Sequence, residues 1–528
     1  MELSSKYSHI SKILIALGEL LLLWAVIIAR VFSFNRFVGN EHDVLPFARQ
    51  FFDRSWLPND WYLNLTVGYR QVFNYIQGFL IDWLGFLDGA YIGRLLVYLI
   101  LAIAFFIFFR TIGLRFFLGI IVVYLFLENQ SLIAGEWIAG GADPKTVAYA
   151  FGLIAFASFF REKYLIGFAL AGAALSFHVL IGIYSLFSVV MATILTQGPI
   201  KEKIILLIRK SWPFLITGIF GIIAIFQQLL PQAGIDANKA WQIYVEFRVP
   251  HHVLPSAWQG IEWIFILIIA SFLFLIVFFV FRKNALKFIS AYALACITLF
   301  IFGLVLFFLD QTSLLRFYWF RYPDVMVPFL SLVVIALLIN GIADLNLSDY
   351  PRIPPKIHWV QWMLRYGLPV LFAIFAILLL AESRTYLQGK YQRGLNRKST
   401  KTQVALEWIN ENTPEEAVFL VDPLMNEFYT YAQRARFVSF SHPPQSAPEL
   451  LEWFDRLTLI NGNQKPDIPP AKGKMQESFA NLDADLIEQI ANEHGVNYYL
   501  GRSGTELPFR LVYQDDTFAL YRLDRMSD

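Results

Sequence analysis

The stretch ILIALGELLLLWAVIIARVFSF (residues 13–34) decides the fold class of this chain. A helix needs about 20 mostly apolar residues to cross the hydrocarbon core of a bilayer, and this run has that length. Two later runs, 264–281 and 288–309, are similarly long and apolar. We therefore predict a polytopic α-helical membrane protein. No small-residue cleavage site follows the first run, so we expect it to stay in place as an anchor.

The composition agrees with this class and excludes several others. Hydrophobic residues make up 57% of the 528 residues and charged residues only 16%, whereas soluble domains carry about 25% charged residues. The net charge of +2 gives no reason to expect a nucleic-acid partner. Cys296 is the only cysteine, which excludes disulfides within one chain and a cysteine-based metal site. The sequence has no phosphate-binding glycine loop, dinucleotide-binding glycine fingerprint or histidine–glutamate zinc motif.

Apolar segments predict about eleven crossings, which divide the chain into a transmembrane domain (1–382) and a soluble domain (383–528). The predicted crossings lie near residues 13–34, 90–109, 116–128, 144–160, 164–177, 179–196, 212–230, 259–281, 286–309, 325–341 and 366–381.

Lysine and arginine gather in alternate connections, and such connections are usually cytoplasmic. The basic set comprises Lys6, Lys12, Arg110, Arg115, Arg161, Lys163, Lys201, Lys203, Arg209, Lys210, Arg282, Lys283, Lys287, Arg352, Lys356 and Arg365. We therefore expect a cytoplasmic N-terminus and an extracytoplasmic C-terminal domain. The longer connections, 35–72 and 231–258, then lie outside, as do most of the polar residues that could carry chemistry. Segment 74–91 has an amphipathic pattern and is expected to lie in the membrane interface.

After the last crossing the composition changes to that of a small α/β domain. Helices are expected at 401–412, 446–457 and 483–494, with Ser399 or Thr400 capping the first and Gly495 ending the last. Short runs rich in β-branched and aromatic residues predict strands near 417–421, 435–440, 496–501, 509–514 and 518–524. The polar segment 461–475 is expected to be a loop.

The first outer connection contains two carboxylates, Glu41 and Asp43, in FVGNEHDVLPFARQFF (37–52). Such a pair can supply a base or oxygen ligands for a hard cation, although polar residues are also ordinary in a solvated loop. Asp60 is a further carboxylate of this connection and is equally consistent with a helix cap.

A pair of histidines, His251 and His252, stands between prolines in EFRVPHHVLPSAW (246–258). We expect a stiff, non-helical loop, in which adjacent side chains point apart and only one enters a shared site. Imidazole can bind phosphate, move a proton or ligate a metal. Packing at the membrane interface would explain the same residues.

Three further positions are candidates for binding an anion. Asp143 and Lys145 begin a crossing helix whose N-terminus attracts negative charge, and Asp143 alone could be a structural cap. Arg316 and Arg321 lie among aromatics, where they could grip a phosphate or reach toward the headgroups. His178 should lie at the outer tip of a short helical hairpin.

The layout resembles the GT-C superfamily of membrane glycosyltransferases. The likeness is carried by ALEWINENTPEEAVFLVDP (405–423) and FYTYAQRARFVSF (428–440), and by shorter patches at 40–50, 140–152 and 248–255. It implies a multi-pass protein of the bacterial inner membrane, with the C-terminal domain in the periplasm. Such a protein would transfer a sugar from a polyprenyl-phosphate carrier to an acceptor hydroxyl on the outer face, with inversion.

The resemblance also implies roles for particular residues. Glu41 or Asp43 matches the acid of the first loop, which acts as the base or helps to bind a divalent metal, with His251 as a further ligand. In many members two acids are adjacent, whereas here His42 separates them, so the choice between Glu41 and Asp43 stays open. Residues expected to bind substrate or phosphate are His251, His252, Arg321, Lys145, Arg248 and His178.

Other classes remain open at this point. A transporter, a flippase or a scaffold of an envelope complex would also be polytopic. Transporters are typically built from internal repeats with helices broken at mid-membrane. The sequence shows no clear repeat, and its polar residues gather toward one surface, which favours the enzyme. A binding role for the C-terminal domain alone is the third reading.

Overall fold

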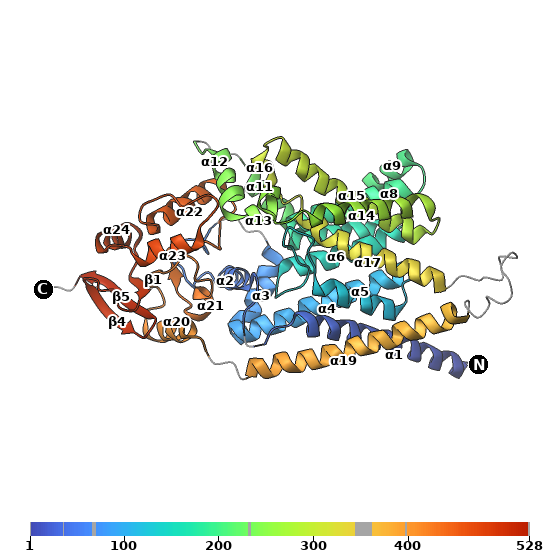
Figure 1. Cartoon of the computed structure of the whole chain (residues 1–528), viewed down its shortest axis with the longest axis horizontal. Coiled ribbons are helices and arrows are strands. Elements are labelled where there is room, and N and C mark those ends of the chain that lie inside the picture. Colours follow the sequence, from blue (N-terminus) through green and yellow to red (C-terminus); the bar gives the residue numbers. More distant parts are fainter. Residues whose placement is uncertain are drawn as a thin grey trace.

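Apolar helices form one end of the molecule, and a small sheet with its own helices forms the other (Figure 1). In Figure 1 the helical bundle lies to the right, and the C-terminal domain, in orange to red, lies to the left. The computed structural model describes residues 2–34, 36–65, 70–230, 234–343, 362–395 and 399–525. Arg352 and Lys356, from the predicted cytoplasmic set, lie outside these ranges.

Seven described helices are long and apolar enough to cross a membrane. They are α1 (Glu2–Val31), α4 (Phe86–Ile112), α8 (Val179–Thr196), α14 (Glu262–Val280), α15 (Asn284–Phe308), α17 (Arg321–Ala343) and α19 (Leu368–Leu395). Four shorter apolar helices join them: α5 (Phe116–Glu128), α6 (Pro144–Phe160), α7 (Tyr164–Phe177) and α11 (Ile219–Leu229). Each predicted crossing overlaps at least one of these helices, which confirms the polytopic α-helical fold.

The connections contain short helices that the apolar pattern does not reveal. They are α2 (Glu41–Phe52), α3 (Gln71–Leu84), α9 (Ile200–Lys210), α10 (Trp212–Thr217), α12 (Ala237–Gln242), η1 (Ile243–Arg248), α13 (Pro250–Val253), η2 (Pro255–Ala257), α16 (Thr312–Leu315) and η5 (Met363–Gly367). The predicted crossing 212–230 is thus two helices, α10 and α11, which meet at Gly218.

The prediction of one interfacial helix over 74–91 was wrong in its boundary. Gly85, at φ +82°, separates α3 from α4, and residues 86–91 are the first turns of the long helix α4. A residue with a side chain rarely adopts this backbone conformation, so glycine allows the sharp break. The amphipathic part is α3, where Tyr75 and Trp83 are strongly exposed. These aromatics suit a helix that lies at the level of the headgroups.

The boundary expected at 382/383 falls within α19, which continues to Leu395. The next helix, α20 (Lys401–Asn412), is the first helix of the C-terminal domain. At its start the Thr400 hydroxyl accepts from the Gln403 N–H, and the Gln403 side chain accepts from the Thr400 N–H. This reciprocal capping box marks a firm helix start. The junction of the two domains therefore lies between α19 and α20.

The C-terminal domain is a five-stranded mixed sheet with flanking helices. Strand order is β2-β1-β3-β5-β4, parallel from β2 to β3 and antiparallel from β3 to β4. The strands are β1 (Val418–Leu420), β2 (Ala435–Arg436), β3 (Tyr498–Arg502), β4 (Phe509–Gln514) and β5 (Phe518–Arg525). The remaining helices are α21 (Phe428–Tyr431), α22 (Ala447–Ile460), α23 (Lys472–Ala480) and α24 (Ala484–His494). The predicted loop 461–475 ends earlier than expected, at the start of α23.

The C-terminal domain rests on the first outer connection. Asp60, 1% exposed, accepts hydrogen bonds from the backbone N–H of Leu63 at 2.8 Å and from that of Arg436, in β2, at 3.0 Å. Nearby, Asn59 Nδ2 donates to the Glu416 carbonyl at 3.0 Å. Asp60 is therefore a docking residue between the domains and not a helix cap.

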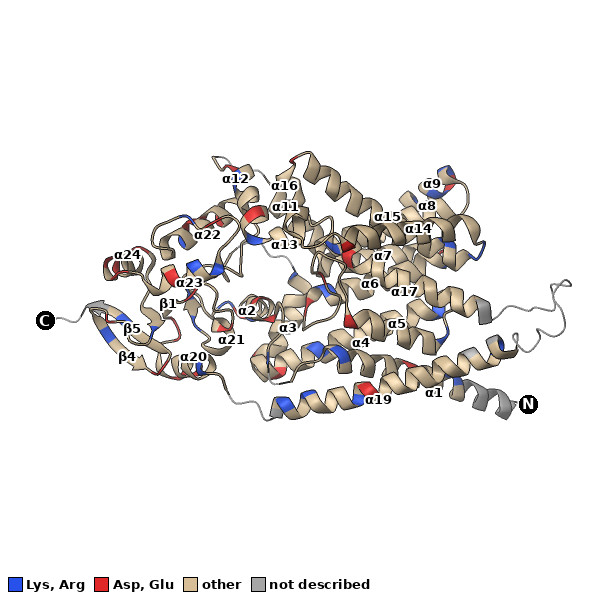
Figure 2. Cartoon of the chain, in the orientation of Figure 1, with Lys and Arg blue, Asp and Glu red and all other residues tan. Residues whose placement is uncertain are grey.

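Charge is unevenly distributed over the two parts. Figure 2 shows α14, α15 and α17 almost entirely without lysine, arginine or acidic residues, whereas the C-terminal domain carries both signs. This distribution is what a helical bundle immersed in lipid requires, because an unpaired charge in hydrocarbon is costly. The protein is therefore a multi-pass membrane protein, and its orientation stays a prediction.

Labelling of single cysteines tests the orientation. Cys296 is the only cysteine of the chain and is buried, so a Cys296→Ser background leaves the introduced cysteine as the single thiol. We expect a membrane-impermeant maleimide, applied to the outer face of intact membranes, to label Lys465→Cys in an exposed loop of the C-terminal domain. The equally exposed Lys201→Cys on α9 should react only after permeabilisation. Labelling of Lys201→Cys alone in intact membranes would reverse the orientation.

Candidate functional site

Glu41, the first residue of α2, belongs to a buried ion pair. Its side chain is 1% exposed, and that of Arg94, on α4, is fully buried. Arg94 Nε donates to Glu41 Oε1 at 2.7 Å, and the backbone N–H groups of Val38 and Ala142 donate to the two carboxylate oxygens at 2.8 Å. With both oxygens engaged, Glu41 ties the first connection to the residues before α6. It is not placed to act as a base.

Asp43 is more accessible and less firmly held. Tyr62 Oη donates to Asp43 Oδ1 at 2.8 Å, whereas Arg70 Nη1 lies 3.8 Å from Oδ2, and the side chain is 23% exposed. Burial raises the pKa of Asp43 above its ordinary 3.8, although Arg70, the Tyr62 hydroxyl and Arg248 act in the opposite direction. A partly exposed carboxylate with a raised pKa is suited to accept a proton. Of the two acids left open by the sequence, the geometry favours Asp43.

Asp324, on the first turn of α17, holds the segment that precedes α6. Its carboxylate is fully buried. It accepts hydrogen bonds of 2.6–3.0 Å from five donors: the Ser131 hydroxyl and the backbone N–H groups of Leu132, Ile133, Ala134 and Glu136. Five donors offset the cost of burying the charge. The segment is thereby held in one conformation.

Glu136, at the end of that segment, forms ion pairs with two basic side chains, those of Lys145 and Arg321. Lys145 Nζ lies 2.8 Å from Glu136 Oε1 and 3.3 Å from the centre of the Trp137 ring, and Arg321 Nε contacts Oε2. Burial acts to raise the pKa of Glu136, but Arg321 and Lys145 together lower it to about 2. Lys145 is 3% exposed, whereas Arg321 is 21% exposed. Arg321 is thus the member of this cluster that remains accessible.

A pocket of about 300 Å³ opens at the end of the bundle that faces the C-terminal domain. It is called the outer pocket below, because this end is the outer one in the predicted orientation. Its basic and aromatic lining comprises Arg70, His178, Trp241, Tyr244, Arg316, Phe317, Tyr318 and Arg321. Its aliphatic lining comes from α8 and α11 and comprises Val179, Leu180, Ile183, Ile225 and Leu229. Gln228, Pro444 and Gln445 complete the wall, and no Asp or Glu is among these described residues. The pocket therefore offers excess positive charge beside an apolar surface.

Arg316 is the clearest anion-binding group in the pocket. Its guanidinium lies 3.8 Å from the centre of the Trp241 ring and 4.8 Å from that of Phe317. Its Nη1 is buried and has no hydrogen-bond partner among the described residues, and burial lowers the pKa of Arg316 to about 10. Because a buried donor without a partner is costly, this geometry fits a site that is completed by an anionic ligand.

Two of the six residues predicted to bind substrate or phosphate line this pocket. His178 lies at the tip between α7 and α8, as expected, and Arg321 lies at the start of α17. The other four, His251, His252, Arg248 and Lys145, are not in the lining; Arg248 Nη2 donates to the Ser441 carbonyl at 2.9 Å. Sequence reasoning missed Arg70, which directly precedes α3, because nothing local connects it to Asp43.

The histidine pair adopts a different structure from the one predicted. Pro250–Val253 is a single helical turn, α13, and the two imidazole centres lie 4.0 Å apart. Proline is well tolerated at the first position of a helix, so it starts the turn here and does not prevent it. His252 Nδ1 lies 2.6 Å from the Ala134 carbonyl and so donates to it. Burial and Arg321 lower the pKa of His252, and the neutral ring thus supports the segment that Asp324 holds.

The three residues proposed as metal ligands, Glu41, Asp43 and His251, do not fit that role. The described ranges contain no group of three or more His, Cys, Asp or Glu side chains placed to hold a metal ion. Both Glu41 oxygens already accept hydrogen bonds, whereas a hard cation needs several free oxygen ligands.

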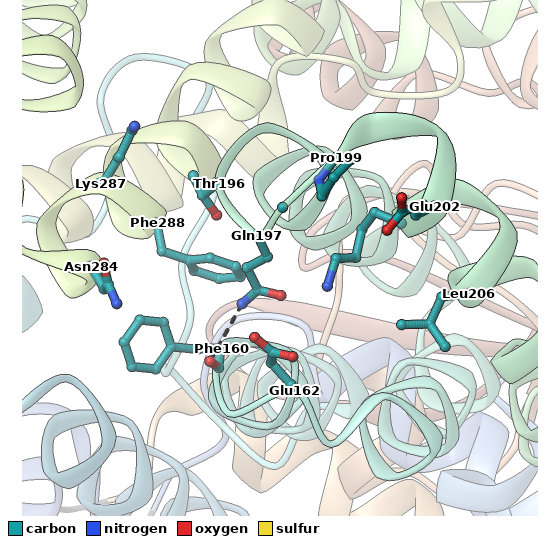
Figure 3. Close-up of a pocket in the computed structure, with 12 residues that line it drawn as sticks. Phe160, Glu162, Thr196, Gln197, Pro199, Glu202, Leu206, Asn284, Lys287 and Phe288 are labelled. Carbon is teal, nitrogen blue, oxygen red and sulfur yellow. Dashed lines mark hydrogen bonds between the residues drawn. The ribbon is translucent and has the colours of Figure 1, made fainter.

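A second cavity, of about 440 Å³, lies near α8 and α9, at the end of the bundle away from the C-terminal domain (Figure 1). Figure 3 shows the residues that line it. It is bounded by the turn after α6, the start of α9 and the start of α15, and Gln197 Nε2 reaches the Phe160 carbonyl across it. Its four charged lining residues, Glu162, Glu202, Lys203 and Lys287, balance in sign. The outer pocket, with three arginines and no acid in its lining, has the stronger chemical bias.

Comparisons with known proteins place the fold. A family described as a domain of unknown function (DUF6798) matches residues 400–460. No curated protein sequence matches the chain. Among solved structures, ArnT from Cupriavidus metallidurans bound to undecaprenyl phosphate is similar, with a TM-score of 0.55 at 13% identity over 97% of this chain and 98% of ArnT. ArnT in the apo state gives 0.52 at 12% identity over 98% of each chain. ArnT is a GT-C protein, so the predicted GT-C fold is confirmed.

The different surroundings of the two acids give different expectations for stability. Glu41→Gln removes the partner of a fully buried arginine, and breaking such a pair typically costs about 3–5 kcal/mol. Asp43→Asn removes a partly exposed charge and should change the stability little. Thermal unfolding of the purified protein in detergent measures both. A wild-type melting temperature for Glu41→Gln would contradict the structural role.

Proposed function

We propose that this protein is a membrane glycosyltransferase that moves a sugar from a polyprenyl-phosphate carrier to an acceptor hydroxyl at the outer face of the membrane. Asp43 acts as the base, and the arginines of the outer pocket hold the phosphate. The observation that carries the proposal is the pocket itself: three guanidinium groups and an aliphatic wall in one cavity, with Asp43 3.8 Å from one of those arginines. A lipid phosphate has both of the matching features.

The similarity to ArnT supports the choice of ligand. That protein was crystallised with undecaprenyl phosphate, and it has the same fold along nearly its whole length. At 13% identity the likeness itself concerns only the fold. The lining of this chain's own pocket is therefore what supports a lipid phosphate as the ligand.

The reaction is a single displacement. The Asp43 carboxylate takes the proton of the acceptor hydroxyl, and the acceptor oxygen forms a bond to the anomeric carbon from the face opposite the phosphate. The bond between that carbon and the phosphate oxygen breaks, and the polyprenyl phosphate leaves with the electron pair. The configuration at the anomeric carbon is therefore inverted. The base must be ionised to act, and the raised pKa of Asp43 brings it closer to neutral pH than an exposed aspartate.

The arginines stabilise the charge that develops on the leaving phosphate. Arg316 offers a buried Nη1 without a described partner, and Arg321 is oriented by Glu136 on one side and Tyr318 on the other. Fixed donors in a site with little water stabilise a developing anion more strongly than water does. The carrier's isoprenoid chain would run along α8 and α11.

Substitution of Asp43 tests the proposed base. We expect the purified wild type, in lipid nanodiscs, to release undecaprenyl phosphate from at least one member of a panel of undecaprenyl-phosphate hexoses and pentoses. Asp43→Asn should reduce that rate by about 10²–10⁴-fold, the usual worth of a general base. The wild-type rate should fall on acidification, with a midpoint above pH 3.8, because burial raises the pKa of Asp43.

Asp53→Asn is the matched control, since Asp53 lies at the end of α2 and pairs with Arg49 away from the pocket. It should leave the rate unchanged. A wild-type rate for Asp43→Asn would exclude this base. Passage of a sugar across proteoliposomes without covalent change, and no release from any donor, would favour the transporter class instead.

Binding of the carrier without its sugar tests the phosphate seat. Arg316→Ala should weaken the binding of undecaprenyl phosphate about 10- to 100-fold, which corresponds to the loss of one charged hydrogen bond of about 1.5–3 kcal/mol. Arg282→Ala, which removes an exposed positive charge between α14 and α15, is the control and should bind normally. Equal affinity for both variants, measured by scanning calorimetry or tryptophan fluorescence, would remove Arg316 from the site.

A further inference from the structure

The C-terminal domain reaches the candidate site through the segment SHPPQS, residues 441–446, called the SHPPQS loop below. Pro444 and Gln445 of this loop line the outer pocket, together with residues of the helical bundle. Arg248 Nη2 donates to the Ser441 carbonyl at 2.9 Å and fixes the start of the loop against η1. The loop lies within the part of the chain that the family model matches.

His442 is the buried residue of this loop and stacks on the aromatic that holds Asp43. It is 2% exposed. Its ring centre lies 5.4 Å from that of Tyr62 with planes 18° apart, and 5.6 Å from that of Tyr429 with planes 27° apart. Tyr62 donates its hydroxyl to Asp43 Oδ1 at 2.8 Å. His442 is therefore two contacts from the proposed base.

His442 Nδ1 has no hydrogen-bond partner among the described residues. Burial, Arg436, Arg248 and His42 all lower the pKa of His442, so the ring is neutral and acts as a flat aromatic spacer between two tyrosines. Stacked aromatic pairs hold each other's orientation as well as burying area. A shift of the His442 ring would therefore move the Tyr62 hydroxyl.

We propose that His442 is a positioning residue of the transfer site: through its stack on Tyr62 it fixes the Asp43 carboxylate, so that the site is complete only when the C-terminal domain is docked. This inference rests on the proposed function and names the part of the C-terminal domain that serves it. The domain then contributes the Pro444–Gln445 wall of the pocket and the orientation of the base.

A positioning role for the C-terminal domain explains why hydrogen bonds join it to the first outer connection near Asp43. Asp60 accepts from the Arg436 N–H at 3.0 Å, and His42 Nδ1 lies 3.3 Å from Thr430 Oγ1. Both contacts join the first outer connection to the C-terminal domain on either side of Asp43 in the sequence. Misplacement of a catalytic group by about 1 Å can cost about 100-fold in rate, so a carboxylate held from a second domain needs a rigid interface.

Kinetics of a substitution series test the positioning role. With whichever undecaprenyl-phosphate sugar the wild type uses, His442→Leu should lower kcat about 10- to 100-fold while KM and the affinity for undecaprenyl phosphate stay within twofold. His442→Phe keeps a flat ring and should restore most of the rate. In a Tyr62→Phe background, His442→Leu should cause little further loss, because Tyr62→Phe has already removed the hydrogen bond to Asp43 that His442 positions.

Two controls separate positioning from folding. His494→Leu alters another histidine of the C-terminal domain, whose ring centre lies 4.9 Å from that of Phe437 with planes tilted by 57°, and should leave kcat unchanged. A disulfide between Asn59→Cys and Glu416→Cys, in a Cys296→Ser background, reports whether the domain is docked, because Asn59 Nδ2 donates to the Glu416 carbonyl. It should form equally in the wild type and in His442→Leu.

The outcomes distinguish this inference from the function it rests on. Unchanged kcat in His442→Leu, or additive losses with Tyr62→Phe, would overturn the positioning role while leaving the transferase intact. Loss of the reporter disulfide together with kcat would assign His442 to docking alone and also overturn it. A wild type that releases undecaprenyl phosphate from no donor in the panel would overturn the proposed function and this inference with it.

Discussion

Buried carboxylates hold the outer end of this protein together, and the candidate site depends on them. Asp324 accepts hydrogen bonds from five donors of the segment before α6. Glu41 accepts from Arg94 and from the backbone N–H groups of Val38 and Ala142. Asp60 joins the C-terminal domain to the first connection. Each charge is costly to bury and is stable only with all its partners in place. The connections are therefore fixed relative to one another without long elements of regular structure.

Against this framework, a few charged groups stand out because they are not fully used. Asp43 accepts a hydrogen bond from the Tyr62 hydroxyl and remains partly exposed, and Arg316 has a buried Nη1 without a partner among the described residues. The contrast between Glu41 and Asp43, two residues apart on α2, is the sharpest example. Both oxygens of Glu41 accept hydrogen bonds within the fold. Asp43 accepts from the Tyr62 hydroxyl and lies beside Arg70 of the pocket. The incomplete satisfaction of Asp43 and Arg316 is what a ligand can exploit.

Features that depend on neighbouring residues could be predicted from the sequence, whereas features that depend on distant partners could not. Hydropathy is local, so each predicted crossing overlaps an apolar helix of the described residues. Neighbouring residues alone also indicated Asp143 as a possible cap, Ser399 or Thr400 as the cap of the next domain's first helix, where the structure has Thr400, and the helix end at Gly495. The break at Gly85 and the helical turn at Pro250 were missed because each is compatible with two local conformations. Glu41 pairs with Arg94, and Arg70 lies near Asp43, so the role of each depends on a partner far away in the sequence. Lys145 is buried against Glu136. One sequence shows neither the distant partners nor the burial. Arg316 and Arg321 were recognised as phosphate candidates, but only the structure separates the arginine without a described partner from the one paired with Glu136.

A cryo-EM map of the protein in nanodiscs with added undecaprenyl phosphate tests most directly whether the outer pocket holds a lipid phosphate. We expect density for a phosphate among Arg70, Arg316 and Arg321, with the isoprenoid chain following α8 and α11 and Asp43 adjacent. A phosphate seated instead in the cavity at the opposite end of the bundle, between Lys203 and Lys287, would contradict this expectation. So would an empty outer pocket at a ligand concentration that saturates the protein.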